Sequence, residues 1–350
     1  MATNGQPFEF FLQWHLTEKC NLWCRHCYQG ERSADEMPLP EITRAIAEAS
    51  DMIREWSDTY GISFRPSMNI TGGEPFLRHD LFDVLKEAKN RGFELFLLTN
   101  GTLVDRARAE ALAGLGVDGV QVSMEGPEDV HDAIRGAGSF AASAAGVERL
   151  VDCGIPVTLN VTLSRLNADH MKKLIAYGSH AGVRRIGFSR LVPSGRGRTM
   201  VSEMLTREEL APLYSSLLSR ELAGVEIVTG DPVAAQLRKR DRVSGDAGDT
   251  IAGGCAAGLA GLTIQSNGNI LPCRRLPLSL GNIRRDSLRE VWAASPVLEA
   301  LRDRSRYRGK CGACPRWARC RGCRAIAYAW SRSRGGDDFL ADDPQCFLET

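Results

Sequence analysis

The chain has 350 residues and carries 44 basic and 43 acidic side chains, which leaves a formal net charge of +1. This balance speaks against a protein that finds its partner through a strong overall field, so we expect no nucleic acid and no membrane partner. The sequence shows no secretory signal and no apolar run long enough to cross a bilayer. These features predict a cytoplasmic protein.

Eleven cysteines are unusually many for a protein of that compartment. Three of them lie near the start of the chain, one lies in the middle, and seven follow residue 254. Thiols in the cytosol stay reduced, and clustered cysteines there more often bind metal than form disulfides. The distribution therefore predicts a chain of two parts with metal bound in each.

A β-rich run at residues 10–16 is followed directly by the loop EKCNLWCRHCYQ, which carries Cys20, Cys24 and Cys27. Three thiolates at the spacing C-x3-C-x2-C can each reach a different iron of one [4Fe–4S] cube and leave the fourth iron open. The alternative is a zinc knuckle with His15 or His26 as its fourth ligand.

Further β-rich runs alternate with helical patterns through the first half of the chain. The clearest helix covers residues 38–56, where Ile42, Ile46, Ala49, Ile53 and Trp56 share one face. Strands alternating with helices predict βαβ units, and six of them predict an α/β fold with a partial (β/α)6 TIM-like barrel. The active site of such a fold lies at the carboxyl ends of the strands. The expected strands are residues 10–16, 66–71, 93–98, 119–124, 156–161 and 184–189.

After about residue 195 the rhythm changes. A polar stretch at 194–203 leads into a helix and then into the Asp/Gly/Arg-rich segment 238–250. We therefore expect a barrel over residues 1–200, a linking helix and loop over 201–254, and a small C-terminal domain over 255–350. The C-terminal part has only short possible strands, at 261–266 and 270–273, so its core looks too small to fold without bound metal.

Two further motifs lie at the ends of predicted strands, as the cysteine loop does: TGGEP at 71–75 and LLTNG at 97–101. Together with C-x3-C-x2-C, they resemble the radical S-adenosylmethionine (radical SAM) enzymes. The resemblance implies that Cys20, Cys24 and Cys27 hold a [4Fe–4S] cluster whose open iron binds SAM. It also implies that reductive cleavage of SAM gives a 5′-deoxyadenosyl radical, which abstracts a substrate hydrogen.

The resemblance implies a set of SAM contacts as well. The TGGEP turn would face the methionyl amine, Ser123 and Arg135 would hold the carboxylate, and Asn160 would contact the ribose. Glu125 stands where the family often has aspartate. Asn100 begins an Asn-Gly pair that is also a common turn, and Asn160 could equally be an inward asparagine bonded to backbone. The implied cofactor residues are Gly72, Gly73, Glu74, Asn100, Ser123, Arg135 and Asn160.

The later cysteines resemble the SPASM extension of this family. GNILPC has its G-x4-C step, and residues 311–323 give C-x2-C-x5-C-x2-C, a run that alone would also suit a zinc ribbon. The resemblance implies two auxiliary [4Fe–4S] clusters. Two departures are the short spacing between Cys320 and Cys323 and Gly261 in place of a further cysteine, which leaves one auxiliary iron open. The implied ligands are Cys311, Cys314, Cys320 and Cys346 for one cluster and Cys255, Cys273 and Cys323 for the other.

These features predict a radical SAM maturase that forms a thioether, a C–C crosslink or a double bond in a ribosomally made peptide. The alternative substrate is a modified tetrapyrrole or another small metabolite, and the remaining alternative is a zinc-stabilised binding protein without catalysis. Expected partners are a flavodoxin- or ferredoxin-type electron donor and a separate leader-peptide-binding protein. A sulfatase-maturing role fits poorly, because Arg274 stands where those relatives have an aspartate base, and arginine cannot accept a proton at working pH.

Overall fold

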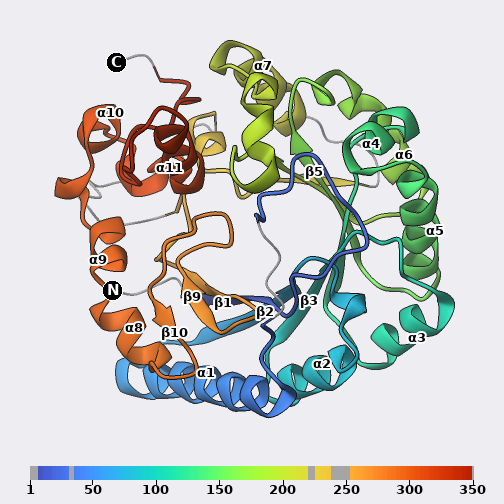
Figure 1. Ribbon diagram of the computed structural model, residues 1–350, viewed down its shortest axis with the longest axis horizontal. Coiled ribbons are helices and arrows are strands. Elements are labelled where there is room, and N and C mark those ends of the chain that lie inside the picture. The colour runs from blue at the N-terminus through green and yellow to red at the C-terminus, as the bar shows by residue number, and fades with distance from the viewer. Residues whose placement is uncertain (1–6, 31–34, 220–224, 238–252, 349–350) are drawn as a thin grey trace.

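The computed structural model describes residues 7–30, 35–219, 225–237 and 253–348. Its described strands form one sheet in the order β10-β9-β8-β1-β2-β3-β4-β5-β6-β7. Helices form the outer rim and the strands lie inside (Figure 1). The strands are β1 Phe8–His15, β2 Phe64–Thr71, β3 Glu94–Thr99, β4 Gly119–Ser123, β5 Val157–Leu163, β6 Arg185–Arg190, β7 Glu226–Val228, β8 Gly261–Ile264, β9 Asn269–Leu271 and β10 Gly281–Asn282.

The six predicted strands are confirmed as β1 to β6, and every neighbouring pair among them is parallel. A helix follows each of the first five strands, so the α/β barrel prediction is confirmed. The barrel helices are α1 Leu39–Tyr60, α2 Leu81–Asn90, α3 Arg106–Gly114, α4 Glu128–Arg135, α5 Ser139–Asp152 and α6 Met171–His180, with the short 3-10 helices η1 Pro75–Leu77 and η2 Ala168–His170.

The amphipathic pattern places α1 against the sheet. Ile42, Ile46, Ala49 and Ile53 are buried on the face that the sequence predicts. Proline stands in the first turn, where its missing N–H breaks no hydrogen bond. The helix ends at Gly61, which takes the left-handed conformation at φ 61° that favours glycine.

The segment after β6 adds a strand that the sequence did not reveal. It contains η3 Gly195–Glu203, α7 Arg207–Leu218, β7 and η4 Pro232–Gln236. Three-residue β7 pairs in parallel with β6 and extends the sheet by one strand. The Asp/Gly/Arg-rich stretch 238–250 lies outside the described residues.

The C-terminal part continues the barrel sheet at its other edge. β8 pairs in parallel with β1, from Phe11 opposite Gly261 to Trp14 opposite Ile264. A β-carbon at position 261 would lie 2.0 Å from the Phe11 carbonyl oxygen, so this close approach requires glycine. The remaining elements are α8 Leu288–Ala294, α9 Pro296–Arg302, α10 Gly309–Ala313 and α11 Arg324–Ser333, with η5 Arg304–Arg306 and η6 Trp317–Arg319.

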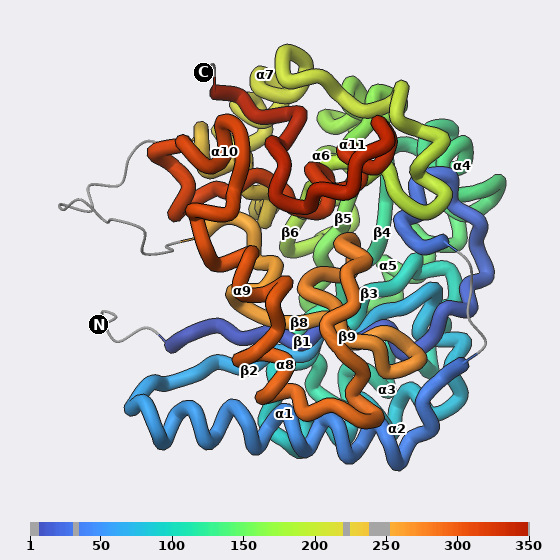
Figure 2. The backbone as a smooth tube through the Cα atoms, turned by 60° about the vertical axis from the view of Figure 1, so that its left-hand side comes forward, coloured from blue at the N-terminus to red at the C-terminus, as the bar shows by residue number. Residues whose placement is uncertain are grey.

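Two contacts fix the C-terminal part to opposite sides of the barrel. On one side α8 packs on α1 (Figure 2). The ring centres of Trp292 and Trp56 lie 5.9 Å apart in this contact. On the other side the buried guanidinium of Arg190, at the end of β6, donates to Asp231 at 2.7 Å and to Asp343 at 2.8 Å. Arg190 therefore joins the barrel, the linking segment and the last residues of the chain.

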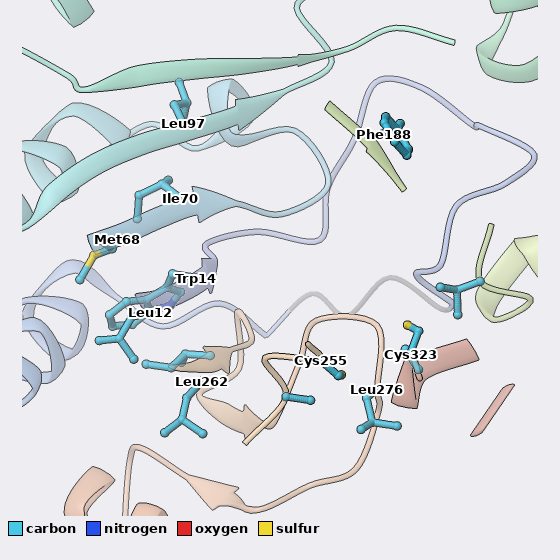
Figure 3. Close-up of a cluster of buried hydrophobic side chains, with 14 of the residues drawn as sticks. Leu12, Trp14, Met68, Ile70, Leu97, Phe188, Cys255, Leu262, Leu276 and Cys323 are labelled. Atoms are coloured by element: carbon cyan, nitrogen blue, oxygen red, sulfur yellow. The ribbon is translucent and has the colours of Figure 1, made fainter. Parts of the chain in front are cut away.

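One apolar core runs through both parts. Leu12 and Trp14 of β1, Ile70 of β2 and Leu262 of β8 are each 0% exposed and belong to the same buried cluster. Figure 3 shows Cys255, Leu276 and Cys323 near these barrel side chains. No helix among the described residues is long and apolar enough to cross a membrane.

Candidate active site

The main cavity lies where the parallel strands end. It measures about 950 Å³ including its open mouth. The strands contribute Thr71, Thr99, Ser123, Asn160 and Ser189 to its wall, and the loop after β1 contributes its three cysteines. The prediction that chemistry gathers at the carboxyl ends of the strands thus agrees with where the structure places the cavity.

Contacts from distant parts of the chain hold the loop that carries Cys20, Cys24 and Cys27. The Arg25 amide donates to the Ile134 carbonyl at 2.9 Å, and the Gly197 amide donates to the Cys27 carbonyl at 3.1 Å. Burial raises the pKa of the Cys24 thiol, so a metal would have to displace its proton. Three sulfur-bearing side chains thus face one cavity from a fixed loop.

The donor set fits an iron–sulfur cluster better than a single ion. Among the described residues, no three His, Cys, Asp or Glu side chains are gathered closely enough to hold one metal ion. The two histidines of the zinc alternative have other partners. His15 contacts the Tyr28 hydroxyl at 3.3 Å, and His26 lies 3.1 Å from the Glu125 carboxylate. A cube of four irons needs more room than one ion, because each thiolate reaches a different iron.

The TGGEP turn packs against the start of the cysteine loop. A β-carbon on Gly72 would lie 2.2 Å from the Thr17 carbonyl oxygen, and one on Gly73 would lie 2.2 Å from that of Lys19. Both glycines also line the cavity. The absence of a side chain at both positions therefore lets the turn pack against the loop and support it.

Glu74 lies behind the cavity wall. Its carboxylate is fully buried and accepts from the Thr99 hydroxyl and the Asn100 amide, each at 2.8 Å. It is not among the residues that line the cavity. These bonds fix the end of β3, whereas the predicted contact with the SAM amine stays a prediction.

The other predicted cofactor residues come together on the cavity wall. Asn100, Ser123, Arg135 and Asn160 all line it. The Asn100 side chain amide lies 3.9 Å from the Cys20 sulfur. The chain thus brings amide, hydroxyl and guanidinium groups beside the three cysteines, which suits a cofactor that carries an amino acid group and a ribose.

Arg135 is already engaged by a protein carboxylate. Its Nε and Nη2 atoms donate to Glu125 Oε1 at 3.0 and 2.6 Å, and its Nη1 atom lies 3.7 Å from the Cys24 sulfur. Burial alone would raise the pKa of Glu125, but Arg135 and His26 hold it well below its ordinary value. Glu125 therefore orients Arg135 toward the cysteine loop, a connection that the sequence did not reveal.

A second cavity, of about 690 Å³ including its open side, lies in the C-terminal part. Its wall contains Cys311, Cys314, Cys320 and Cys346, the four cysteines that the SPASM resemblance assigns to one cluster. The Gln236 amide lies 3.4 Å from the Cys320 sulfur and 3.5 Å from the Cys346 sulfur. Burial raises the pKa of Cys320 to about 11, so metal binding there would release a proton.

The other three cysteines, Cys255, Cys273 and Cys323, do not line this cavity. Burial raises the pKa of Cys323 to about 12, with Arg275 and Cys255 close enough to influence it. Between Cys320 and Cys323 the backbone is left-handed at Arg321 and Gly322, with φ 59° and 60°. The Arg321 side chain donates to the Cys255 carbonyl at 2.8 Å and so connects the two groups of cysteines.

Sequence reasoning missed several residues of the site. Tyr28 and Arg196 line the main cavity, and Gln236 lines the second. Tyr28 directly follows Cys27 in the cysteine loop, whereas Arg196 and Gln236 belong to no motif that signals a role. Cys153, by contrast, ends α5 and lines neither cavity.

A partial α/β barrel whose first loop presents three cysteines into a polar cavity defines a class of enzymes with cluster-based radical chemistry. The chain belongs to the radical SAM superfamily, which residues 14–178 match, and residues 255–324 match SPASM, an iron–sulfur cluster-binding domain.

Three curated relatives match nearly the whole chain. The pre-heme d1 synthase of Dinoroseobacter shibae is 32% identical over 96% of this chain and 85% of its own length. The AdoMet-dependent heme synthase of Methanosarcina barkeri is 29% identical over 96% and 95%. The mycofactocin maturase of Mycobacterium ulcerans is 29% identical over 98% and 89%.

The fold is also that of a solved structure, SuiB of Streptococcus suis bound to S-adenosylmethionine. The TM-score is 0.74 at 19% identity, over 97% of this chain and 78% of that one. The family and these relatives make the protein an enzyme of radical redox chemistry, which sets aside the zinc-stabilised binding protein.

Proposed function

We propose that this radical SAM enzyme modifies a tetrapyrrole that carries carboxylate side chains. The observation behind the radical chemistry is the three-cysteine loop facing the cavity at the carboxyl ends of the strands. The relatives named heme synthase and pre-heme d1 synthase, at 29% and 32% identity over 96% of the chain, support the proposed substrate class. A tetrapyrrole, the alternative substrate in the sequence analysis, is thus preferred to a ribosomally made peptide.

Different residues of the main cavity would hold the cluster and SAM. Cys20, Cys24 and Cys27 would hold the SAM-binding [4Fe–4S] cluster. Bound together, cluster and SAM supply a radical that removes a hydrogen atom from the substrate. The side chains that would position SAM are Asn100, Ser123, Arg135 and Asn160, with the backbone of Gly72 and Gly73.

Two auxiliary [4Fe–4S] clusters would complete the set. Cys311, Cys314, Cys320 and Cys346 surround the second cavity and would hold one of them. Cys255, Cys273 and Cys323 would hold the other. Such clusters suit a reaction in which the substrate loses an electron after hydrogen abstraction. A flavodoxin- or ferredoxin-type protein would supply the electron that starts each cycle.

Peptide maturation is the second candidate, because the mycofactocin maturase is 29% identical over 98% of the chain. The substrate would then be a ribosomally made peptide. A separate leader-peptide-binding protein would be the further partner.

The test compares substrates on anaerobically reconstituted protein. Tetrapyrroles with free carboxylates and small ribosomal peptides are each added with SAM and a reductant, and 5′-deoxyadenosine and product mass are measured. We expect the tetrapyrroles to raise 5′-deoxyadenosine above the substrate-free rate and to change mass. Stimulation by peptides alone would overturn the tetrapyrrole assignment in favour of the second candidate.

A further inference from the structure

A tight turn carries two arginines into the main cavity. The Leu276 amide donates to the Cys273 carbonyl at 2.9 Å, which closes a turn with Arg274 and Arg275 at its tip. Leu276 is fully buried and anchors the turn in the core. Among the described residues that line the cavity, these two arginines are the only ones that follow residue 253.

The other arginines of the cavity have protein partners. Arg135 pairs with Glu125, and Arg190 pairs with Asp231 and Asp343. Arg196 donates to the Cys24 carbonyl at 3.0 Å, and its guanidinium lies 4.2 Å from the centre of the Trp23 ring. The charges of Arg135 and Arg190 are therefore neutralised within the protein, and the guanidinium of Arg196 is held in place.

Arg274 and Arg275 differ from them. The guanidinium of Arg274 lies 5.8 Å from the centre of the Tyr28 ring, and no described carboxylate pairs with it. The Nε atom of Arg275 is buried without any hydrogen-bond partner among the described residues. The part of the chain that the structure describes contributes no Asp or Glu to the cavity wall. A buried N–H donor without a partner is unfavourable, so the Nε atom of Arg275 calls for an acceptor from outside the chain.

The thiolates of a cluster could offset part of this charge. Arg275 lies close enough to Cys323, Cys273 and Asp231 for their charges to act on its guanidinium, so it lies within the field of the C-terminal cysteines. The charges of Arg274 and Arg275 both act on Tyr28, and the charge of Arg274 also acts on His15, so the two guanidinium groups share one neighbourhood. The described residues of the cavity wall offer no carboxylate to either of them.

We propose that Arg274 and Arg275 together bind a carboxylate of the substrate inside the main cavity. A guanidinium fork matches a carboxylate with two parallel hydrogen bonds, and two forks on one turn fix its position. The acid group would thereby orient the substrate carbon skeleton toward the loop of Cys20, Cys24 and Cys27. This inference rests on the proposed function and specifies the group by which the substrate is recognised.

The test is a binding measurement on the anaerobically reconstituted holoenzyme. Coproporphyrin III, which has four free carboxylates, and its tetramethyl ester are titrated separately and followed by their absorbance. We expect the free acid to bind at least about tenfold more tightly than the ester, since a charge-assisted hydrogen bond is worth about tenfold or more in affinity. This comparison needs no variant.

Variants then test whether Arg274 and Arg275 cause the tighter binding of the free acid. R274Q and R275Q should each weaken binding of the free acid about tenfold and leave the ester unchanged, whereas R274K and R275K should recover part of the loss. The control is R285Q, because Arg285 is exposed and lies outside the cavity wall. Iron content must match the native chain in each variant.

The outcomes separate the two ideas. Equal binding of acid and ester by the native chain would overturn the carboxylate site and leave the tetrapyrrole assignment standing. Failure of both porphyrins to bind, with arginine-dependent binding of a peptide that ends in glutamate, would overturn the tetrapyrrole assignment and support the carboxylate site. Loss of iron in R274Q and in the lysine variants would show that the turn serves the clusters, and would overturn the inference.

Discussion

At the scale of single residues, the proposed radical chemistry depends on the sulfur atoms of Cys20, Cys24 and Cys27, the proposed cluster ligands. Each side chain lines the main cavity, and His26, which lines it too, lies 3.1 Å from the Glu125 carboxylate.

Replacing all three cysteines with alanine should remove about four irons per chain, one cube, and abolish 5′-deoxyadenosine formation. The C-terminal clusters should remain, because their cysteines belong to a separate part of the chain. Iron and sulfide analysis with a SAM cleavage assay measures both effects. The matched control is C153A, since Cys153 ends α5 away from both cavities. SAM cleavage by the triple variant would refute the assignment of these ligands.

The buried pair of Glu125 and Arg135 gives a second test at this scale. E125Q leaves the guanidinium without its charged partner, and breaking a buried ion pair from one side lowers the free energy of unfolding by about 3 to 5 kcal/mol. Urea unfolding of the apo chain measures the change. The control is E226Q, whose pair with Arg185 is exposed and should change stability by about 1 kcal/mol or less. Equal effects of the two substitutions would contradict the structural importance of Glu125.

The grouping of Cys20, Cys24 and Cys27 at one cavity could be predicted from their spacing, because a short loop brings nearby thiols together whatever the rest of the chain does. The partners of Arg135 could not. Glu125, His26 and Cys24 meet it only because α4 packs beside the cysteine loop, and that packing is a tertiary contact with no local signal.

At the scale of elements, the turn after β2 supports the loop after β1. Gly73 has an ordinary φ, so a side chain there is opposed only by the backbone of Lys19 and Glu18. The backbone cannot move aside as a flexible side chain could.

G73A should therefore displace the cysteine loop and reduce iron bound by the first cluster while the C-terminal clusters remain. The measurement is cluster absorbance and iron content after reconstitution. G114A is the control, because Gly114 ends α3 with nothing within 4 Å of the added carbon. That variant should keep its iron, and alanine should stabilise the helix by about 0.5 to 1 kcal/mol. Normal iron content in G73A would show that the loop tolerates the shift.

The strands of the barrel were predictable because each is a β-rich run next to a helical pattern. The pairing of β8 with β1 was not, because a four-residue strand carries no information about a partner 250 residues away in the chain. Strand β7 in the linking segment could not be predicted either, because its three residues form a strand only by pairing with β6.

At the scale of the whole molecule, Arg190 joins three regions. Asp231 and Asp343 each accept two hydrogen bonds from the Arg190 guanidinium, and Asp343 also accepts one from the Cys323 amide at 2.7 Å. The cysteines of the C-terminal part are thereby tied to the barrel.

R190Q should leave two buried carboxylates unpaired, lower the free energy of unfolding by about 3 to 5 kcal/mol or more, and release iron from the C-terminal clusters. Urea unfolding and iron analysis measure these effects, with R185Q on the same strand as the exposed control.

Burial would raise the pKa of Asp343, but Arg190 holds it below its ordinary value. The pair therefore stabilises the fold fully above the unfolded-state pKa of about 4, and the stabilisation is lost as pH falls through the lower folded-state value. The difference between R190Q and the native chain should shrink in that range, and a difference independent of pH would contradict the ion pair.

The pairing of β8 with β1 also has a consequence for biosynthesis. During translation β1 emerges early, but the strand that completes its edge emerges roughly 250 residues later. At about 5 to 20 residues per second, that edge stays open for roughly 12 to 50 seconds. An open edge is a template for pairing with another nascent chain. The cell must therefore keep the unfinished barrel apart from its neighbours until the C-terminal part has left the ribosome.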